Sequence, residues 1–145
     1  DLIRNLWSFG LSLIPLDVRQ ESDRHTEALD AITRYLGQGS YQQWDESTRM
    51  SWLQKELSSS RPLVRPGEWH DHPDIFNSTT VDTLETMQMI AEQHEESLGA
   101  YVISQATHPS DVLAVLLLQR DAGVKSPLRV VPLFETLDDL EGAAD

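Results

Sequence analysis

Cysteine is absent from the 145-residue chain, which excludes disulfide bonds, cysteine-ligated zinc and a thiol nucleophile. Basic residues are scarce: 11 lysines and arginines stand against 24 aspartates and glutamates, a formal net charge of −13. A field of that sign repels nucleic acid and anionic membrane surfaces, so we expect neither as a partner. Long apolar runs are also missing, and no run approaches the roughly 18 residues of a membrane span. An anionic ligand would need individual arginines or a metal to reverse this field locally.

The two ends of the chain suggest a segment of a larger protein. The chain starts at Asp1 and not at a methionine. The apolar residues between positions 2 and 7 have the spacing of a helix, which suggests that the chain begins in the last turns of one. It stops soon after a further helix is predicted to begin, over residues 136 to 143. We therefore expect the chain to be incomplete at both ends.

The first half of the chain combines one strand with two helices. Residues 11 to 18 (LSLIPLDV) are typical of a β-strand, although Pro15 donates no ladder hydrogen bond and fits best at an edge or a strand start. Helices are predicted over residues 23 to 36 and 46 to 57, where apolar residues recur at helical spacing. Residues 58 to 77 mix proline, glycine, serine and histidine without periodicity, which predicts the main loop.

The second half is more regular. A helix is predicted over residues 80 to 96, followed by a strand (99 to 104), a helix (107 to 123) and a strand (128 to 134). Strands that alternate with helices through short links are typical of parallel βα units. With the first strand, this predicts a helix-rich α/β fold of about three parallel strands with intervening helices. A partial barrel and a partial doubly wound sheet both fit that pattern.

In parallel βα proteins, functional side chains lie where the C-terminal ends of the strands open into loops. This rule selects Arg19 and Gln20 after the first predicted strand, Ser104 and Gln105 after the second, and Glu135 after the third.

Arg19 and Glu135 have the most informative chemistry of these candidates. The guanidinium of Arg19 offers a rigid fork of donors that matches phosphate or carboxylate oxygens, or a structural ion pair with Asp17, Glu21 or a neighbouring loop. The carboxylate of Glu135 is a hard oxygen ligand that suits Mg²⁺ or Mn²⁺. Alternatively, Glu135 favours the dipole of the helix that follows, beginning with Thr136.

Other residues lack the context that a site needs. His70 and His72 lie in the predicted loop without a third ligand at the spacing of a zinc site, which favours a solvated loop. His25 beside Arg24 is typical of packing or pairing at a helix start. Ser104 lacks the G-x-S-x-G turn of a nucleophilic serine, and no P-loop or dinucleotide-binding glycine pattern is present.

Four stretches, in this order, resemble the central part of phosphoenolpyruvate carboxylases: LDVRQESDRHTEALDAITRYLGQGSY, SRPL, GAYVISQATHPSDVLAVLLLQ and PLRVVPLFETLDDLE. The resemblance covers nearly the whole chain except residues 64 to 78, and Gln105 stands where the family often has methionine. It implies that residues 1 to 145 form the central segment of an eight-stranded (β/α)8 TIM-type barrel domain, incomplete at both ends, with a loop over about 58 to 77.

The resemblance also implies a function. The family converts phosphoenolpyruvate and bicarbonate to oxaloacetate and phosphate with Mg²⁺ or Mn²⁺, and we expect a cytoplasmic homotetramer. Within its motifs, Arg19 binds the substrate phosphate, Glu135 is one of two metal carboxylates, and Leu133 belongs to the apolar wall near the reacting carbon. The family's catalytic histidine and second metal carboxylate fall outside these residues, so we expect the 145 residues alone to be inactive and poorly folded.

Two other interpretations stay open. The chain could belong to a different metal-dependent barrel enzyme acting on a phosphorylated acid, which keeps Arg19 and Glu135 but forms another product. It could instead be a noncatalytic homologue or an acidic interaction module, in which substitution of either residue has no carboxylation to remove.

Overall fold

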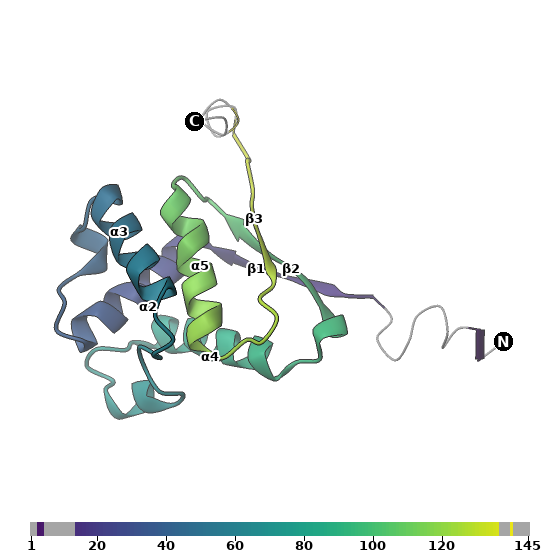
Figure 1. Ribbon diagram of the computed structural model, residues 1–145, viewed down its shortest axis with the longest axis horizontal. Helices are drawn as coiled ribbons and strands as arrows, with labels where there is room; N and C mark the ends of the chain where they lie inside the picture. The colour runs from purple at the N-terminus through teal and green to yellow at the C-terminus, as the bar shows by residue number, and fades with distance from the viewer. Residues whose placement is uncertain (1–2, 5–13, 137–139, 141–145) are drawn as a thin grey trace.

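The computed structural model describes residues 3–4, 14–136 and 140 (Figure 1). The helix expected at the N-terminus and most of the helix expected over residues 136 to 143 lie outside these residues. Figure 1 shows the helices gathered at one side of the molecule, with the sheet beside them.

Three parallel strands form one sheet in the order β1–β2–β3. The strands are β1 (Leu16–Glu21), β2 (Leu98–Ser104) and β3 (Arg129–Pro132). Parallel neighbours need long crossover connections, which explains why helices occupy the chain between them. The prediction of a helix-rich α/β fold with three parallel strands is confirmed. Within the described residues the sheet is open, with β1 and β3 as its edges.

The first strand begins later than predicted. The apolar run over residues 11 to 18 placed it too early, because β1 starts only after Pro15, which has no N–H to donate to the ladder. Ile14 and Leu16 are 73% and 68% exposed, so the end of the apolar run is not buried in the core. As a result, Arg19 lies within the strand and not beyond its end.

The helices lie close to their predicted positions. They are α2 (Ser22–Tyr35), α3 (Glu46–Leu57), α4 (Ser78–Glu92) and α5 (Pro109–Asp121), with single-turn 3₁₀ helices η1 (Tyr41–Gln43), η2 (Glu68–Asp71) and η3 (Glu95–Ser97). The helix predicted over residues 80 to 96 is thus shorter, with η3 following it after a break.

Among the described residues, no helix has the length and apolar character needed to cross a membrane.

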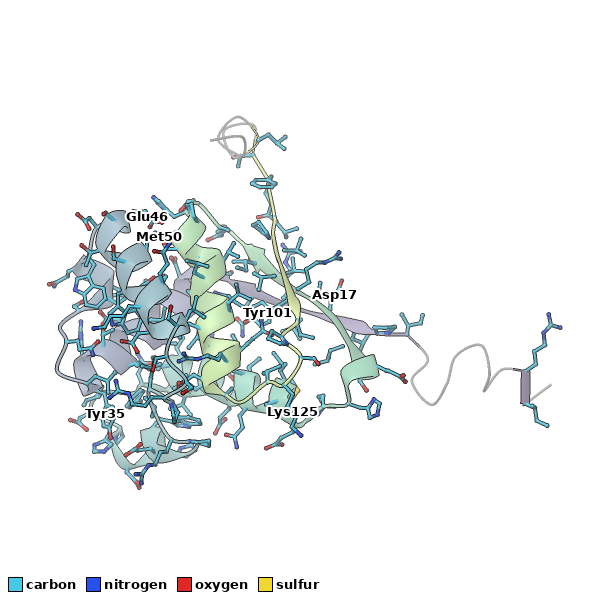
Figure 2. The ribbon with its side chains drawn as sticks, in the orientation of Figure 1. Asp17, Tyr35, Glu46, Met50, Tyr101 and Lys125 are labelled. Atoms are coloured by element: carbon cyan, nitrogen blue, oxygen red, sulfur yellow. The ribbon has the colours of Figure 1, made fainter. Side chains whose placement is uncertain are left out.

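Acidic side chains fix the start of α3 and join it to the start of α5. Asp45 begins α3 by accepting the backbone N–H of Thr48 at 2.8 Å. The carboxylate of Glu46 then accepts from Ser110 in the first turn of α5, at 3.0 Å from the backbone N–H and 2.7 Å from the hydroxyl. Figure 2 shows Glu46 at the end of α3 near α5. A carboxylate at a helix N-terminus is favourable because free N–H groups and the helix dipole meet it there.

The core lies between the sheet and the helices. Tyr101 and Ile103 of β2 are fully buried and pack with Leu29 of α2 and Leu117 of α5. In Figure 2, Tyr101 lies beside α5. Burial of side chains of this size contributes roughly 1.5–3 kcal/mol each, which makes β2 the best anchored strand.

The two faces of the sheet differ in what covers them. Residues paired across a parallel ladder point to the same face, so Val18 and Val130, the partners of Tyr101, face the helices. The alternate register row, Arg19, Val102 and Val131, therefore faces away from them.

A bulge interrupts the β1–β2 ladder between Leu16 and Val18. There the carboxylate of Asp17 replaces a backbone acceptor, because its Oδ1 accepts the N–H of Ala100 at 2.7 Å. This oxygen lies so close to Gly99 that a Cβ atom at position 99 would overlap it. A side chain at position 99 would therefore displace the carboxylate of Asp17 from its hydrogen bond with Ala100.

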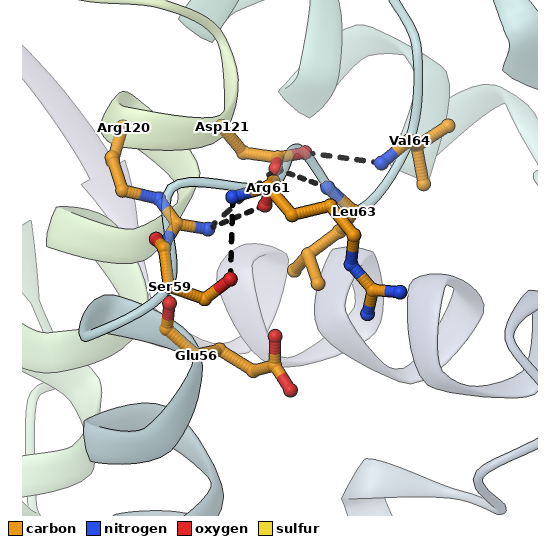
Figure 3. A network of polar contacts seen from close by, with 7 residues as sticks. All are labelled: Glu56, Ser59, Arg61, Leu63, Val64, Arg120 and Asp121. Atoms are coloured by element: carbon orange, nitrogen blue, oxygen red, sulfur yellow. Dashed lines mark hydrogen bonds and ion pairs between the residues drawn. The ribbon is translucent and has the colours of Figure 1, made fainter.

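The end of α5 holds the loop that follows α3 (Figure 3). The guanidinium of Arg120 donates to three backbone carbonyl groups, those of Glu56, Ser59 and Arg61. The carboxylate of Asp121 accepts two backbone N–H groups, of Leu63 at 2.6 Å and Val64 at 3.4 Å. The first third of the loop predicted over residues 58 to 77 is therefore tied to α5 although it has no regular structure.

We expect Arg120→Gln to loosen this loop, because hydrogen bonds to a charged group contribute about 1.5–3 kcal/mol and three carbonyl groups would lose their donor. Cleavage by subtilisin within residues 58 to 64 should become at least about tenfold faster under native conditions, since cleavage there requires local opening. The control is Arg61→Gln, whose exposed side chain leaves the network intact. Equal cleavage rates for the two variants would show that Arg120 does not hold the loop.

Candidate functional site

Arg19 and Glu135 lie against each other. Nη2 of Arg19 donates to Oε1 of Glu135 at 2.9 Å, although the residues are 116 positions apart in the sequence. Arg19 is on β1 and Glu135 follows β3, so the contact passes across the end of β2. The side chains are 61% and 46% exposed, which leaves both accessible to a ligand.

Apolar side chains border Arg19 on the face of the sheet opposite the helices. Val102 and Val131 occupy the same register row as Arg19 and are half-buried. Leu133 follows β3, and its N–H donates to the carbonyl of Ile103 at 2.8 Å, which extends the ladder by one position. Two positions after Val131, Leu133 falls on the same face. The arginine therefore stands beside an apolar row.

An open hollow of about 250 Å³ lies at the C-terminal end of β1, lined by Arg19, Gln20, Glu21, Arg24 and Ser104. It brings together three residues that the strand-end rule selected, Arg19, Gln20 and Ser104. Arg24 was not selected as a site residue. Its position in the first turn after β1 was the available signal, because a helix start next to a strand end faces the same opening. Arg24 also pairs with Asp82 of α4 at 3.3 Å.

The ends of β1 and β2 are joined by a side chain. The hydroxyl of Ser22 donates to the carbonyl of Gln105 at 2.8 Å. Gln105 has a φ of 56°, the only positive φ at a non-glycine residue in the described part of the chain. Such a conformation is strained and persists only where surrounding contacts impose it. The hydrogen bond from Ser22 is one such contact, and it holds the exit of β2 beside the start of α2.

His25 is buried beneath this junction and is not at the surface of the hollow. Its side chain is 1% exposed, and its Nε2 lies 2.8 Å from the hydroxyl oxygen of Tyr101. Burial lowers the pKa of His25 to about 4, so the imidazole is neutral at neutral pH. The same cause raises the pKa of Tyr101. The sequence predicted that His25 packs at the start of a helix, and its buried position near the start of α2 agrees with this.

The loop histidines lie apart from the strand ends. Nε2 of His70 is 3.3 Å from Oε1 of Glu85, and the ring of His72 packs 5.1 Å from that of Tyr35. In the residues that the structure describes, no three histidines or carboxylates are grouped to hold a metal ion.

Glu135 nevertheless has the properties of a single metal ligand. Mg²⁺ is commonly bound through one or two carboxylates together with water and substrate phosphate, and an exposed carboxylate at a strand end suits that role. The described part of the chain thus provides one hard oxygen ligand next to an arginine.

These features define a class of protein: a parallel βα protein in which an arginine and a carboxylate meet at the strand ends beside an apolar wall. The comparison of sequences makes the class specific. The family model described as phosphoenolpyruvate carboxylase matches residues 1–145, and the chain belongs to that family.

Individual relatives agree with the family match. The chain is 57% identical over 144 residues to a housekeeping isozyme of phosphoenolpyruvate carboxylase from Saccharum hybrid and 56% identical over 145 residues to phosphoenolpyruvate carboxylase from Nicotiana tabacum. It is 55% identical over 144 residues to C4 phosphoenolpyruvate carboxylase from Flaveria trinervia. Each alignment covers 99% of this chain and 14% of the relative. The chain therefore spans about one seventh of the length of these relatives.

The buried His25 predicts how stability depends on pH. Its folded pKa of about 4 lies below the ordinary value of 6.5, so between these values the unfolded chain binds the proton and the folded chain does not. Stability should therefore fall as the pH is lowered from 6.5 towards 4, by up to about 3 kcal/mol from this group.

Thermal unfolding between pH 4 and 7 measures this effect in the wild type, in His25→Gln and in His70→Gln as a control with an exposed histidine. His25→Gln should flatten the pH dependence and His70→Gln should not. The same slope in all three proteins would show that folding does not lower the pKa of His25.

Proposed function

We propose that this chain is the central segment, residues 1 to 145, of the barrel domain of a full-length phosphoenolpyruvate carboxylase. That enzyme carboxylates phosphoenolpyruvate with bicarbonate and forms oxaloacetate and phosphate. The observation that carries the proposal is the contact between Arg19 and Glu135 at the strand ends, in a chain that belongs to this family. The relatives' names suggest the reaction, and the geometry supports it by setting an arginine beside a carboxylate.

A TIM-type barrel is part of the proposal. The three strands are neighbours in chain order, and both faces of the sheet carry apolar residues. Val102 and Val131 on the face opposite the helices are suited to a barrel interior, which is filled by branched side chains. Further strands would continue the sheet at the edges formed by β1 and β3.

Arg19 binds the phosphate group of phosphoenolpyruvate in this proposal. Its guanidinium can donate two parallel hydrogen bonds to phosphate oxygens, and it remains charged at any working pH. In a chain with a net charge of −13, such a group is needed to hold a trianionic substrate. Its place on the exposed face of β1, beside the hollow, gives the phosphate access.

Glu135 holds Mg²⁺ or Mn²⁺ together with ligands from elsewhere in the enzyme. When bound, the ion would supply a Lewis acid for the negative charge that develops on the substrate. Leu133 belongs to the apolar wall that keeps water from the reacting carbon.

In the mechanism that the family implies, bicarbonate attacks the phosphorus, and the bond to the enol oxygen breaks. Carboxyphosphate and the enolate of pyruvate form. The C–O bond to the phosphoryl group of carboxyphosphate then breaks and releases carbon dioxide and phosphate, and the enolate carbon attacks the carbon dioxide to give oxaloacetate.

Assembly as a homotetramer and location in the cytoplasm belong to the same proposal and rest on family membership.

Product analysis separates the alternatives. Formation of oxaloacetate from phosphoenolpyruvate and bicarbonate supports the carboxylase. A different product from a phosphorylated acid would indicate another metal-dependent barrel enzyme. No turnover with an intact metal site would indicate a noncatalytic homologue.

We expect Glu135→Gln in the full-length protein to lower turnover about 10²- to 10³-fold, because loss of one group that stabilises transition-state charge costs about 3–4 kcal/mol. The concentration of Mn²⁺ required for half-maximal rate should also rise. Both are measured by oxaloacetate formation over a series of Mn²⁺ concentrations. Glu85→Gln is the matched control, since this exposed carboxylate pairs with His70 away from the strand ends. Near-normal kinetics for Glu135→Gln would remove Glu135 from the site.

Arg19→Lys should reduce kcat/KM for phosphoenolpyruvate by at least about tenfold, because lysine keeps the charge but loses the bidentate fork. Steady-state kinetics at saturating Mn²⁺ test this. The control is Arg24→Lys, which changes an arginine lining the same hollow but paired with Asp82. Equal effects of the two substitutions would mean that charge alone, and not the fork of Arg19, serves the substrate.

A further inference from the structure

We propose that the ion pair between Arg19 and Glu135 is a latch that metal binding opens. In the structure the guanidinium of Arg19 donates to the carboxylate of Glu135. A cation that takes this carboxylate releases the fork of Arg19 for the substrate phosphate. The inference rests on the proposed function, which assigns the cation to Glu135 and the phosphate to Arg19.

Direct competition for one oxygen carries the proposal. Nη2 of Arg19 lies 2.9 Å from Oε1 of Glu135. A divalent cation binds carboxylate oxygen at about 2.0–2.1 Å, which would place two positive groups on the same carboxylate. Their repulsion weakens whichever is held less tightly. The side chain of Arg19 is 61% exposed, so nothing prevents it from turning away.

Once released from Glu135, the side chain of Arg19 can bind an anion in the hollow that it lines. Arg19 lines the hollow of about 250 Å³ at the end of β1, together with Arg24 and Ser104. Arg19 lines this hollow while its guanidinium reaches across the end of β2 to Glu135, so an anion in the hollow would lie next to the paired arginine. The same side chain thus serves either Glu135 or an anion in the hollow.

The latch makes the two ligands cooperative. If the cation removes the carboxylate from Arg19, it raises the affinity of Arg19 for phosphate, and phosphate raises the affinity of Glu135 for the cation by the same factor. Both partners are exposed, so the expected factor is small. Exposed ion pairs are worth at most about 1 kcal/mol, which corresponds to about a fivefold change in an equilibrium constant.

The first experiment measures Mn²⁺ binding to the full-length protein without substrate, by electron paramagnetic resonance of the free ion. Arg19→Gln removes the competitor and should bind Mn²⁺ about two- to fivefold more tightly than the wild type. Arg24→Gln removes an equal charge from the same hollow without opening the latch. It controls for simple loss of positive charge and should change the affinity by less than about twofold.

The second experiment measures binding of inorganic phosphate in the absence of metal, by calorimetry. Glu135→Gln frees Arg19 and should bind phosphate about two- to fivefold more tightly than the wild type. Glu21→Gln is the matched control, because Glu21 lines the hollow while the described structure pairs Arg19 with Glu135. Circular dichroism and gel filtration establish that each variant is folded, and either experiment alone is sufficient to test the latch.

The outcomes separate the latch from the proposed function. Tighter Mn²⁺ binding by Arg19→Gln than by Arg24→Gln, or tighter phosphate binding by Glu135→Gln than by Glu21→Gln, supports the latch. If the wild type binds Mn²⁺ and forms oxaloacetate but both pairs of variants behave alike, the latch is wrong and the proposed function stands. If the wild type neither binds Mn²⁺ nor forms oxaloacetate, the proposed function is wrong and the latch with it.

Discussion

The hydrogen-bonded ladder around β2 is the constraint on which the rest of the structure depends. In the described sheet β2 pairs with both other strands, and its buried Tyr101 and Ile103 anchor it to the helices. The register places Arg19 beside Val102, on the face away from the core. A slip by one residue would exchange the two faces and turn the charge of Arg19 into the helix layer. The meeting of Arg19 with Glu135 is therefore a consequence of strand register, and the hydrophobic core maintains it.

Local sequence patterns predicted the helices and strands well. They did not predict contacts between residues that are far apart in the sequence. The bounds of α3 followed from its apolar spacing and lie at Glu46–Leu57 as predicted. The predicted start of the first strand was too early, because the apolar run before Pro15 was assigned to the strand while β1 begins at Leu16. The strand-end rule and the family motifs selected Arg19 and Glu135, and the sequence offered Asp17, Glu21 or a neighbouring loop as the ion-pair partner of Arg19 without naming Glu135. The observed partner is 116 residues away and becomes visible only once the strand order is known.

The acidic composition shapes how arginines are used. Four arginines in the described residues have a carboxylate within ion-pair distance: Arg19, Arg24, Arg34 and Arg120. Arg120 is committed to backbone carbonyls as well, and its network has a structural role. Arg19 differs because its pair joins β1 to the segment that follows β3, across the end of β2. In a chain with this excess of negative charge, each of these arginines has a carboxylate within reach, and Arg19 finds its partner across the sheet.

The bulge in β1 ties two distant positions into one unit of evolutionary change. The carboxylate of Asp17 occupies the space that a side chain at position 99 would need, and it is also the acceptor for the N–H of Ala100. A larger residue at position 99 displaces the carboxylate of Asp17 from that N–H, and a change at position 17 removes the same acceptor. Across descendants of this sequence, the aspartate and the glycine should therefore be inherited together or lost together, although 81 residues separate them.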